Sequence, residues 1–174
     1  QQYLRIANQS LDNQELAEQL RNASRYDFLT KLKNRTALNM DFENPANKNL
    51  NSNFIVMVTD IDNFKSFNDT NGHAYGNELL GKFAAVLREN FGKKYCYRYG
   101  GDEYLVVIPE MPEEVFSQKI KICQKALNNE FNFSGGYTKG FVKSSADLHS
   151  LIYKADQNLY AAKNAGKNQV IGSL

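Results

Sequence analysis

The sequence predicts an α+β fold in which a central antiparallel sheet is flanked by helices. Runs rich in β-branched and aromatic residues predict strands at 54–59, 95–99, 104–109 and 131–138. Helical patterns lie between them, at 76–90 and 112–128. The paired glycines Gly100 and Gly101 predict a tight hairpin turn between the second and third strands, because such turns need positive φ angles. The resulting β-α-β-β-α-β order is that of the ferredoxin-like fold, in which the first and third strands are neighbours.

Composition indicates one globular domain. The chain has 174 residues, of which 42% are hydrophobic and 23% charged, values that favour a single buried core. A net charge of +2 gives no reason to expect nucleic acid as a partner. Cys96 and Cys123 have no metal-ligand spacing, which favours buried thiols in a reducing compartment. No apolar run is long enough to span a membrane.

Further elements are expected on both sides of this core. A helix is expected at 34–43, an asparagine-rich loop at 44–53, a long helix at 145–165 and a short strand at 169–171. Residues 1–24 form a separate N-terminal segment, with leucines at heptad and single-turn spacing. This segment is interpreted as a coiled-coil or stalk helix, with a frayed, exposed helix as the equal alternative. Because the chain begins with Gln, we expect it to be a piece of a longer protein.

Two acidic clusters end different predicted strands. Asp60 and Asp62 close the first strand, and Asp102 and Glu103 follow the glycine turn. Adjacent carboxylates repel one another unless a cation lies between them. Since the first and third strands are expected to be neighbours, the two clusters should meet. The pattern predicts one metal site, whereas a solvated turn would explain the Gly-Gly-Asp sequence taken alone.

Six groups of short motifs follow one another between residues 25 and 173. They are Asp27-x-Leu29-Thr30-x-Leu32-x-Asn34-Arg35, Asp60-Ile61-Asp62-x-Phe64-Lys65, Asn68-Asp69, Gly72-His73-x-x-Gly76, Arg98-Tyr99-Gly100-Gly101-Asp102-Glu103-Tyr104, and Ala155-Asp156-x-x-Leu159-Tyr160 with Lys163-x-x-Gly166-Lys167-Asn168. With these motifs, residues 25–174 resemble the GGDEF domain, typical of bacterial diguanylate cyclases. The resemblance implies a nucleotide-cyclase-like palm. It also implies a cytoplasmic location, either as a free protein or as the cytoplasmic part of a membrane-anchored sensor.

The resemblance implies a reaction and its metal ligands. The family condenses two GTP molecules into cyclic di-GMP with Mg²⁺ or Mn²⁺ and releases pyrophosphate. Each domain of a homodimer holds one GTP. Asp60, the carbonyl of Ile61, and Asp102 match the metal ligands. Glu103 matches either a further ligand or a group that assists deprotonation of the 3′-hydroxyl, and Asp102 and Glu103 are the expected catalytic residues.

The resemblance also implies the nucleotide contacts. The amides of Asn63, Phe64 and Lys65 would face phosphate at a helix start, and the Lys65 side chain would add a positive charge. Lys163 and Lys167, four residues apart and expected on one helical face, would lie near the triphosphate. Without the resemblance, both lysines would be interpreted as solvated residues late in a helix. The remaining expected contacts are Asn68, His73 and Asn77.

Three positions depart from the family pattern. Asn77 replaces an Asp that accepts both donors of guanine, which predicts weaker guanine preference and entry of ATP unless water or a carbonyl repairs the mismatch. Phe91 and Lys94 replace the Arg and Asp of a product-inhibition site, which predicts no inhibition there. Tyr104 replaces Phe, for which we expect little effect.

Three functions remain open from the sequence. The first is a cyclase that works as a dimer through its stalk helix and facing sites, under an upstream sensory domain absent from this chain. The second is a degenerate module that binds a nucleotide without turnover. A purely structural dimerisation domain is the third, and it would leave the acidic cluster without a use.

Overall fold

The computed structural model describes residues 24–43 and 50–173, together with residues 13, 16 and 20. The expected N-terminal helix at 1–24 and much of the loop at 44–53 therefore lie outside the described residues. None of the helices among the described residues is long and apolar enough to cross a membrane.

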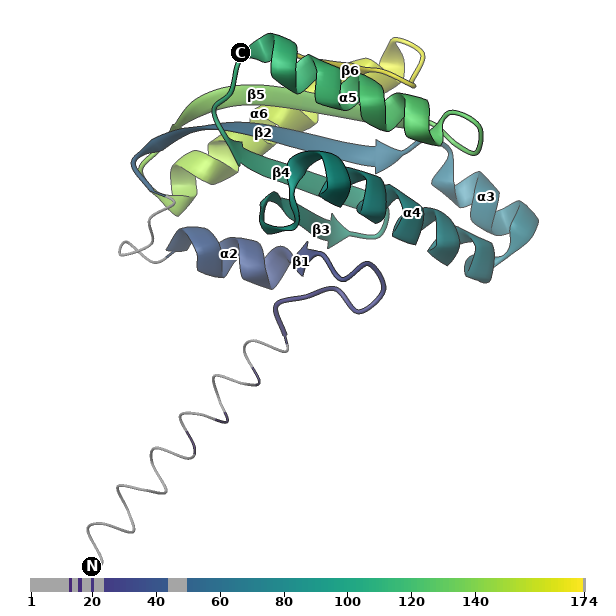
Figure 1. Cartoon of the computed structure of the whole chain (residues 1–174), viewed down its shortest axis with the longest axis horizontal. Helices are drawn as coiled ribbons and strands as arrows, with labels where there is room; N and C mark the ends of the chain where they lie inside the picture. Colours follow the sequence, from purple (N-terminus) through teal and green to yellow (C-terminus); the bar gives the residue numbers. More distant parts are fainter. Residues whose placement is uncertain (1–12, 14–15, 17–19, 21–23, 44–49, 174) are drawn as a thin grey trace, which may run out of the picture.

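A six-stranded mixed sheet forms the centre of the molecule, with the order β1-β3-β4-β2-β5-β6 (Figure 1). Its strands are β1 (Lys33–Asn34), β2 (Ser52–Ile61), β3 (Cys96–Gly100), β4 (Glu103–Pro109), β5 (Phe133–Val142) and β6 (Val170–Ser173). The helices are α2 (Arg35–Glu43), α3 (Phe64–Asn71), α4 (His73–Phe91), α5 (Glu113–Leu127) and α6 (Ser145–Asn164), with a 3₁₀ turn at Lys93–Tyr95. The predicted α+β fold is confirmed: the four central strands are antiparallel, and the first predicted strand (β2) pairs with the third (β4).

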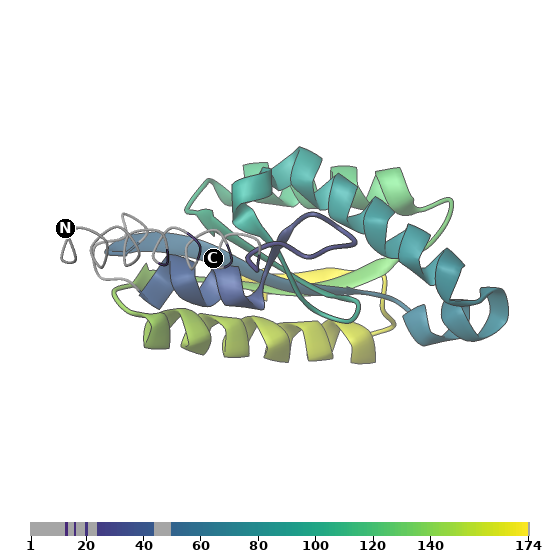
Figure 2. The same cartoon turned by 90° about the horizontal axis from the view of Figure 1, so that it is seen from below.

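Helices cover both faces of this sheet. Figure 2 shows α4 and α5 on one face and α6 on the other. Alternate residues of β2 divide between the two layers: Ile55 and Met57 pack with α4 and α5, whereas Val56 and Val58 pack with α2 and α6. This alternation is the reason that a nearly all-apolar strand sits at the centre of the sheet.

Helix α6 lies directly on the backbone of β5. A Cβ atom added to Gly136 would lie 2.1 Å from both the carbonyl oxygen of Ala155 and the amide nitrogen of Leu159. The helix begins with a capping box, in which Ser144 and Asp147 exchange side-chain and backbone hydrogen bonds. Gly136 sets how closely α6 approaches the sheet, and the capping box sets the residue at which α6 begins. Together they determine the position of the last turn of α6.

Several elements differ from the sequence expectations. The short strand β1, paired with β3 in parallel, was not predicted, and of the separate helix α3 only its start after Asp62 was expected. Helix α4 begins at His73 instead of residue 76, because the turn before it is made by Gly72 with φ 84°. Helix α6 ends at Asn164, so the expected single helix through 165 is slightly too long.

Candidate active site

The two acidic strand ends meet as predicted. In the β2–β4 ladder, Asp60 and Glu103 are direct cross-strand partners. Directly opposed residues of an antiparallel pair project to the same face. That face carries α6, since Val56 and Val58 of the same alternation pack against it. Asp102 precedes Glu103 at the hairpin tip and is half-buried.

Asp60 is a buried carboxylate with an incomplete set of partners. It is only 6% exposed. One of its oxygens, Oδ2, accepts a hydrogen bond from Lys163 Nζ, while Oδ1 is buried and has no hydrogen-bond partner among the described residues. Burial raises the pKa of Asp60 to about 6, against the opposing Lys163 ammonium and with a further contribution from Asp102 and Asp62. An unpartnered buried carboxylate oxygen is costly unless a cation or donor completes it.

Glu103 belongs to the same electrostatic group. Burial raises its pKa, with Asp102 and then Asp156 of α6 acting in the same direction, while Lys163 opposes them. The Lys163 pKa is in turn raised: burial lowers it, but the bond to Asp60 and the charges of Asp60, Asp102 and Glu103 outweigh that effect. Four carboxylates and one lysine therefore interact across this end of the sheet: Asp60, Asp102, Glu103, Asp156 and Lys163.

The donor set fits a hard divalent cation in part. Carboxylate and carbonyl oxygens are the ligands that Mg²⁺ and Mn²⁺ prefer, and Asp60 Oδ1 is one such oxygen without a partner. However, within the described ranges no three His, Cys, Asp or Glu side chains form a ready-made metal cluster. Asp60, Asp102 and Glu103 would hold an ion only with further oxygens, such as the Ile61 carbonyl, water or a phosphate.

Asp62 has a structural position that sequence reasoning missed. It is 6% exposed, and its oxygens accept hydrogen bonds from Ser134 Oγ (2.6 Å) and from the amide of Asn168 (2.8 Å). It therefore joins the end of β2 to β5 and to the turn after α6. The sequence grouped Asp62 with Asp60, but their different partners separate the two roles.

The expected placement of Lys163 and Lys167 on one helical face is wrong. Lys163 lies in the last turn of α6, whereas Lys167 lies beyond the helix, in the left-handed conformation with φ 63°. Lys167 Nζ donates instead to Asn63 Oδ1 at 2.5 Å. Both lysines nevertheless reach the same region, because the chain turns back after Gly166 toward β6: Lys163 contacts Asp60 at the end of β2, and Lys167 contacts Asn63 in the loop that follows.

The predicted phosphate-facing segment begins at a left-handed residue. Asn63 has φ 58° and its side chain does not cap α3, which starts at Phe64. The first-turn amides of α3 are therefore not capped by the side chain of the N-cap residue. Lys65 is exposed in that first turn.

The three remaining predicted contacts lie on the α3–α4 pair. Asn68 packs against α4, since a Cβ on Gly76 would lie 1.8 Å from Asn68 Oδ1. Asn77 follows Gly76 and is exposed, and His73 is exposed one turn earlier. A glycine at position 76 is thus what lets Asn68 approach the helix that carries Asn77.

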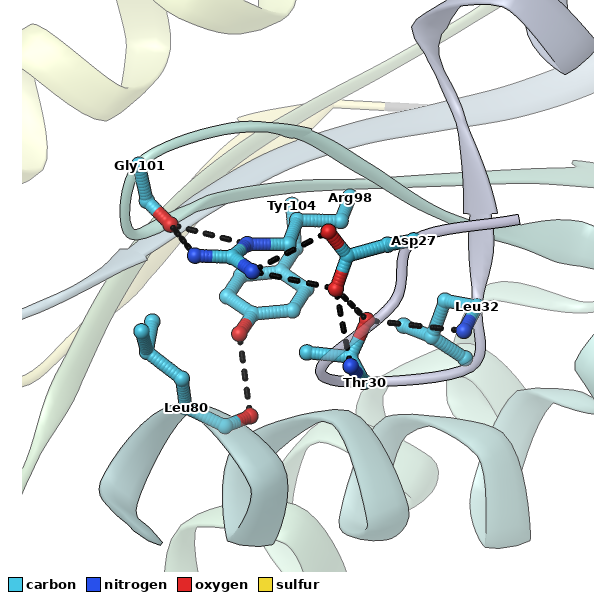
Figure 3. Close-up of polar contacts among 7 residues, drawn as sticks. All are labelled: Asp27, Thr30, Leu32, Leu80, Arg98, Gly101 and Tyr104. Carbon is cyan, nitrogen blue, oxygen red and sulfur yellow. Dashed lines mark hydrogen bonds and ion pairs between the residues drawn. The ribbon is translucent and has the colours of Figure 1, made fainter. Parts of the chain in front are cut away.

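Arg98 ties the glycine turn to the N-terminal loop (Figure 3). Its Nε and Nη2 donate to the carbonyl oxygen of Gly101 at 2.9 and 2.7 Å, and its Nη1 donates to both oxygens of Asp27 at 3.0 and 3.1 Å. Asp27 also accepts from the amide and hydroxyl of Thr30. Burial alone would raise the Asp27 pKa, but the bonds from Thr30 and Arg98 outweigh it and lower that pKa. In the sequence, the opposite charges of Asp27 and Arg98, in two separate motifs, are the signal that could have indicated this ion pair.

Tyr104 anchors the same hairpin to α4. Its buried hydroxyl donates to the carbonyl oxygen of Leu80 at 2.9 Å, and its ring meets Phe83 edge-on. The hairpin that carries Asp102 and Glu103 is therefore held from the α4 side by Arg98 and Tyr104, which are partners in the β3–β4 ladder.

Residues 24–169 match the family described as diguanylate cyclase, GGDEF domain. The chain belongs to the GGDEF family. Two relatives of this GGDEF chain are YtrP of Bacillus subtilis, an uncharacterized protein that is 29% identical over 170 residues, and the diguanylate cyclase DosC of Escherichia coli, 35% identical over 157 residues. The alignments cover 95% and 83% of this chain but only 29% and 34% of those proteins.

A solved GGDEF structure has the same fold. The coiled coil and GGDEF domain of DgcB from Caulobacter crescentus, in complex with c-di-GMP, superposes with a TM-score of 0.78 at 26% identity. The match covers 97% of this chain and 97% of the DgcB chain. The chain is thus a homologue of diguanylate cyclases with their domain fold.

Proposed function

We propose that the chain is a diguanylate cyclase domain that condenses two GTP molecules into cyclic di-GMP. The observation that carries the proposal is the pairing of Asp60 with Glu103 at one end of the sheet, with Asp102 and Lys163 beside them. This is the charge arrangement that phosphoryl transfer needs, because such reactions depend on neutralising and positioning phosphate oxygens.

A divalent ion, Mg²⁺ or Mn²⁺, would stabilise the attacking and leaving oxygens when bound. Asp60 and Asp102, with the Ile61 carbonyl, would hold it. The 3′-oxygen of one GTP attacks the α-phosphorus of the other, the bond to the β-phosphate oxygen breaks, and pyrophosphate leaves. Glu103 would take the proton from the 3′-hydroxyl or ligate the ion.

The substrate contacts follow from the residues around this group. Asn63, Phe64 and Lys65 would bind phosphate through backbone amides and one ammonium, and Lys163 and Lys167 would bind the terminal phosphates. Asn68 and Asn77 would contact the base, with His73 beside them. Two copies must face one another for cyclisation. The greater length of the curated relatives supports a further proposal, that a stalk and a sensory domain precede this domain in the whole protein.

Incubation with GTP and Mg²⁺ or Mn²⁺ tests the proposal. We expect pyrophosphate release and a cyclic dinucleotide separable by chromatography, with a rate that rises faster than linearly with protein concentration. Asp60→Asn should abolish both products while leaving the fold intact by circular dichroism. Absence of product from the chain fused to a dimeric coiled coil would instead favour the nucleotide-binding module without turnover.

Relaxed base specificity is the second candidate, favoured by Asn77. An Asp carboxylate accepts both guanine donors, whereas one face of an Asn amide is a donor. A mismatched polar contact costs about 1–3 kcal/mol, or roughly ten- to a hundredfold in affinity. Asn77→Asp should therefore raise the ratio of GTP to ATP affinity by about that factor. Equal ratios in the two proteins would end this idea without touching the cyclase proposal.

A further inference from the structure

The end of α6 and the turn after it contact the end of β2 and the loop that follows it. Lys163 Nζ donates to Asp60, Lys167 Nζ donates to Asn63 Oδ1 at 2.5 Å, and the Asn168 amide donates to Asp62 Oδ2 at 2.8 Å. Each of the two lysines that the proposed function assigns to phosphate thus has a partner within the protein. Only Lys163 has a carboxylate as that partner.

We propose that Lys163 occupies the cation position at Asp60 while no metal or nucleotide is bound, so that metal and nucleotide binding are coupled through displacement of this lysine. The inference rests on the proposed function, because Asp60 is there assigned to the catalytic metal. It adds a role for Lys163 that phosphate binding alone does not require.

Because Asp60 is buried, a metal ion and the Lys163 ammonium compete for its carboxylate. The Asp60 side chain is 8% exposed, and Lys163 is the hydrogen-bond donor that neutralises it. Little water is present to screen a second positive charge at the same carboxylate, so an ammonium and a divalent ion repel one another strongly there. A divalent ion at the unpartnered Oδ1 would lie beside the Lys163 ammonium on Oδ2, so metal binding at Asp60 is opposed until Lys163 leaves.

The displaced lysine has freedom to move. Its side chain is 38% exposed and stands in the last turn of α6, on a flexible stem. A nucleotide phosphate would offer it a new anionic partner and free Asp60 for the metal. Each ligand then lowers the cost of binding the other, and the coupling must be the same in both directions.

Lys167 provides a matched control within the chain. It has the same charge, lies four residues away and approaches the same loop. Its partner Asn63 is a neutral amide, so its removal frees no carboxylate. General loss of positive charge near the site would affect both lysine variants, whereas displacement from Asp60 concerns Lys163 alone.

The experiment is a calorimetric titration of the whole chain with Mn²⁺ in the absence of nucleotide. We expect Lys163→Met to bind Mn²⁺ about tenfold more tightly than wild type, or ~1.4 kcal/mol, and Lys167→Met to bind it within about twofold of wild type. The titrations are run at about pH 8, because loss of the ammonium also raises the pKa of Asp60 and would let protons compete. Asp60→Asn in the Lys163→Met background should remove the gain.

A non-hydrolysable GTP analogue then measures the coupling. It should tighten Mn²⁺ binding to wild type and tighten it less in Lys163→Met. Unchanged or weaker metal binding by Lys163→Met would overturn the proposal, and so would an equal gain in Lys167→Met or no measurable binding in any variant. Pyrophosphate release by wild type is measured separately: it decides the proposed function, and either result is compatible with either outcome of the metal titrations.

Discussion

Removal of Arg98 is the sharpest test of how the acidic hairpin is held. The Arg98 side chain is 15% exposed and that of Asp27 23%, so their ion pair is largely shielded from water. Arg98→Ala removes both bonds to the Gly101 carbonyl and both to Asp27. Hydrogen bonds to charged groups contribute about 1.5–3 kcal/mol in such settings, and partial exposure reduces this.

We therefore expect Arg98→Ala to lower the free energy of unfolding by about 2 kcal/mol, or roughly 4–8 °C in Tm for a domain of this size. Asp27→Asn should cost about half as much, because an amide oxygen still accepts from Thr30. A double-mutant cycle between the two positions isolates their coupling. The exposed pair Lys82–Glu130 is the control, and Lys82→Ala should change Tm little.

Chemical denaturation gives the stability, and amide hydrogen exchange over residues 99–104 reports on the hairpin itself. Exchange there should accelerate in Arg98→Ala more than in the sheet centre. The low pKa of Asp27 sets the pH dependence: its stabilisation is complete above the ordinary value of 3.8 and is lost as pH falls through its lowered folded value. The difference between wild type and Asp27→Asn should therefore be constant from about pH 7 to 5 and shrink below about 3.8. Zero coupling, or a Tm of Arg98→Ala equal to that of wild type, would refute the assigned role.

Three other predictions concern separate regions. The buried hydroxyl bond of Tyr104 changes the expectation that this residue differs little from Phe. Tyr104→Phe should lose about 1 kcal/mol in chemical denaturation, because that bond disappears while the Leu80 carbonyl stays within α4; an unchanged midpoint would mean that the hydroxyl does not stabilise the fold. Gly136→Ala should destabilise the fold by about 3 kcal/mol or more, since its methyl group would collide with the α6 backbone. Gly81→Ala should stabilise the fold by about 0.5–1 kcal/mol, because Gly81 lies in a helix with open space around its Cβ position. The changes in Tm of the two variants must have opposite signs. Because Phe91 is a buried core residue and Lys94 an exposed cation, cyclic di-GMP should neither bind near them nor inhibit; calorimetric binding abolished by Lys94→Ala would contradict this.

The central strands and the meeting of two acidic clusters could be predicted from the sequence. Runs of β-branched and aromatic residues on either side of a Gly-Gly turn determine a hairpin locally, and the strand order then follows from few topological choices. Asp60 and Glu103 became neighbours through that order alone. The register that makes them direct partners was beyond the pattern, because it depends on packing along all seven pairs of β2 and β4.

The details that failed depend on tertiary contacts. Strand β1 has two residues, too few to leave a periodic pattern, and exists because β3 offers it an edge. Lys167 was assigned to a helix because local spacing allowed it, but the turn through Gly166 reverses the chain first. Asp62 and Arg98 were visible as charged residues, yet their partners lie 72 and 71 positions away in the chain. Pairings between residues so far apart in the chain cannot be predicted from local sequence patterns.

The ladder between β2 and β4 also makes the reactive end of the molecule sensitive to chain length. Phe54 faces Pro109 at one end of the ladder, and Asp60 faces Glu103 at the other. One residue inserted within β4 would turn Glu103 toward α4 and α5, away from Lys163. Two would restore its direction but displace it by about 6.8 Å, at about 3.4 Å per residue. Insertions should therefore be tolerated after Pro109 but not within β4, whichever acidic residues occupy the β3–β4 hairpin.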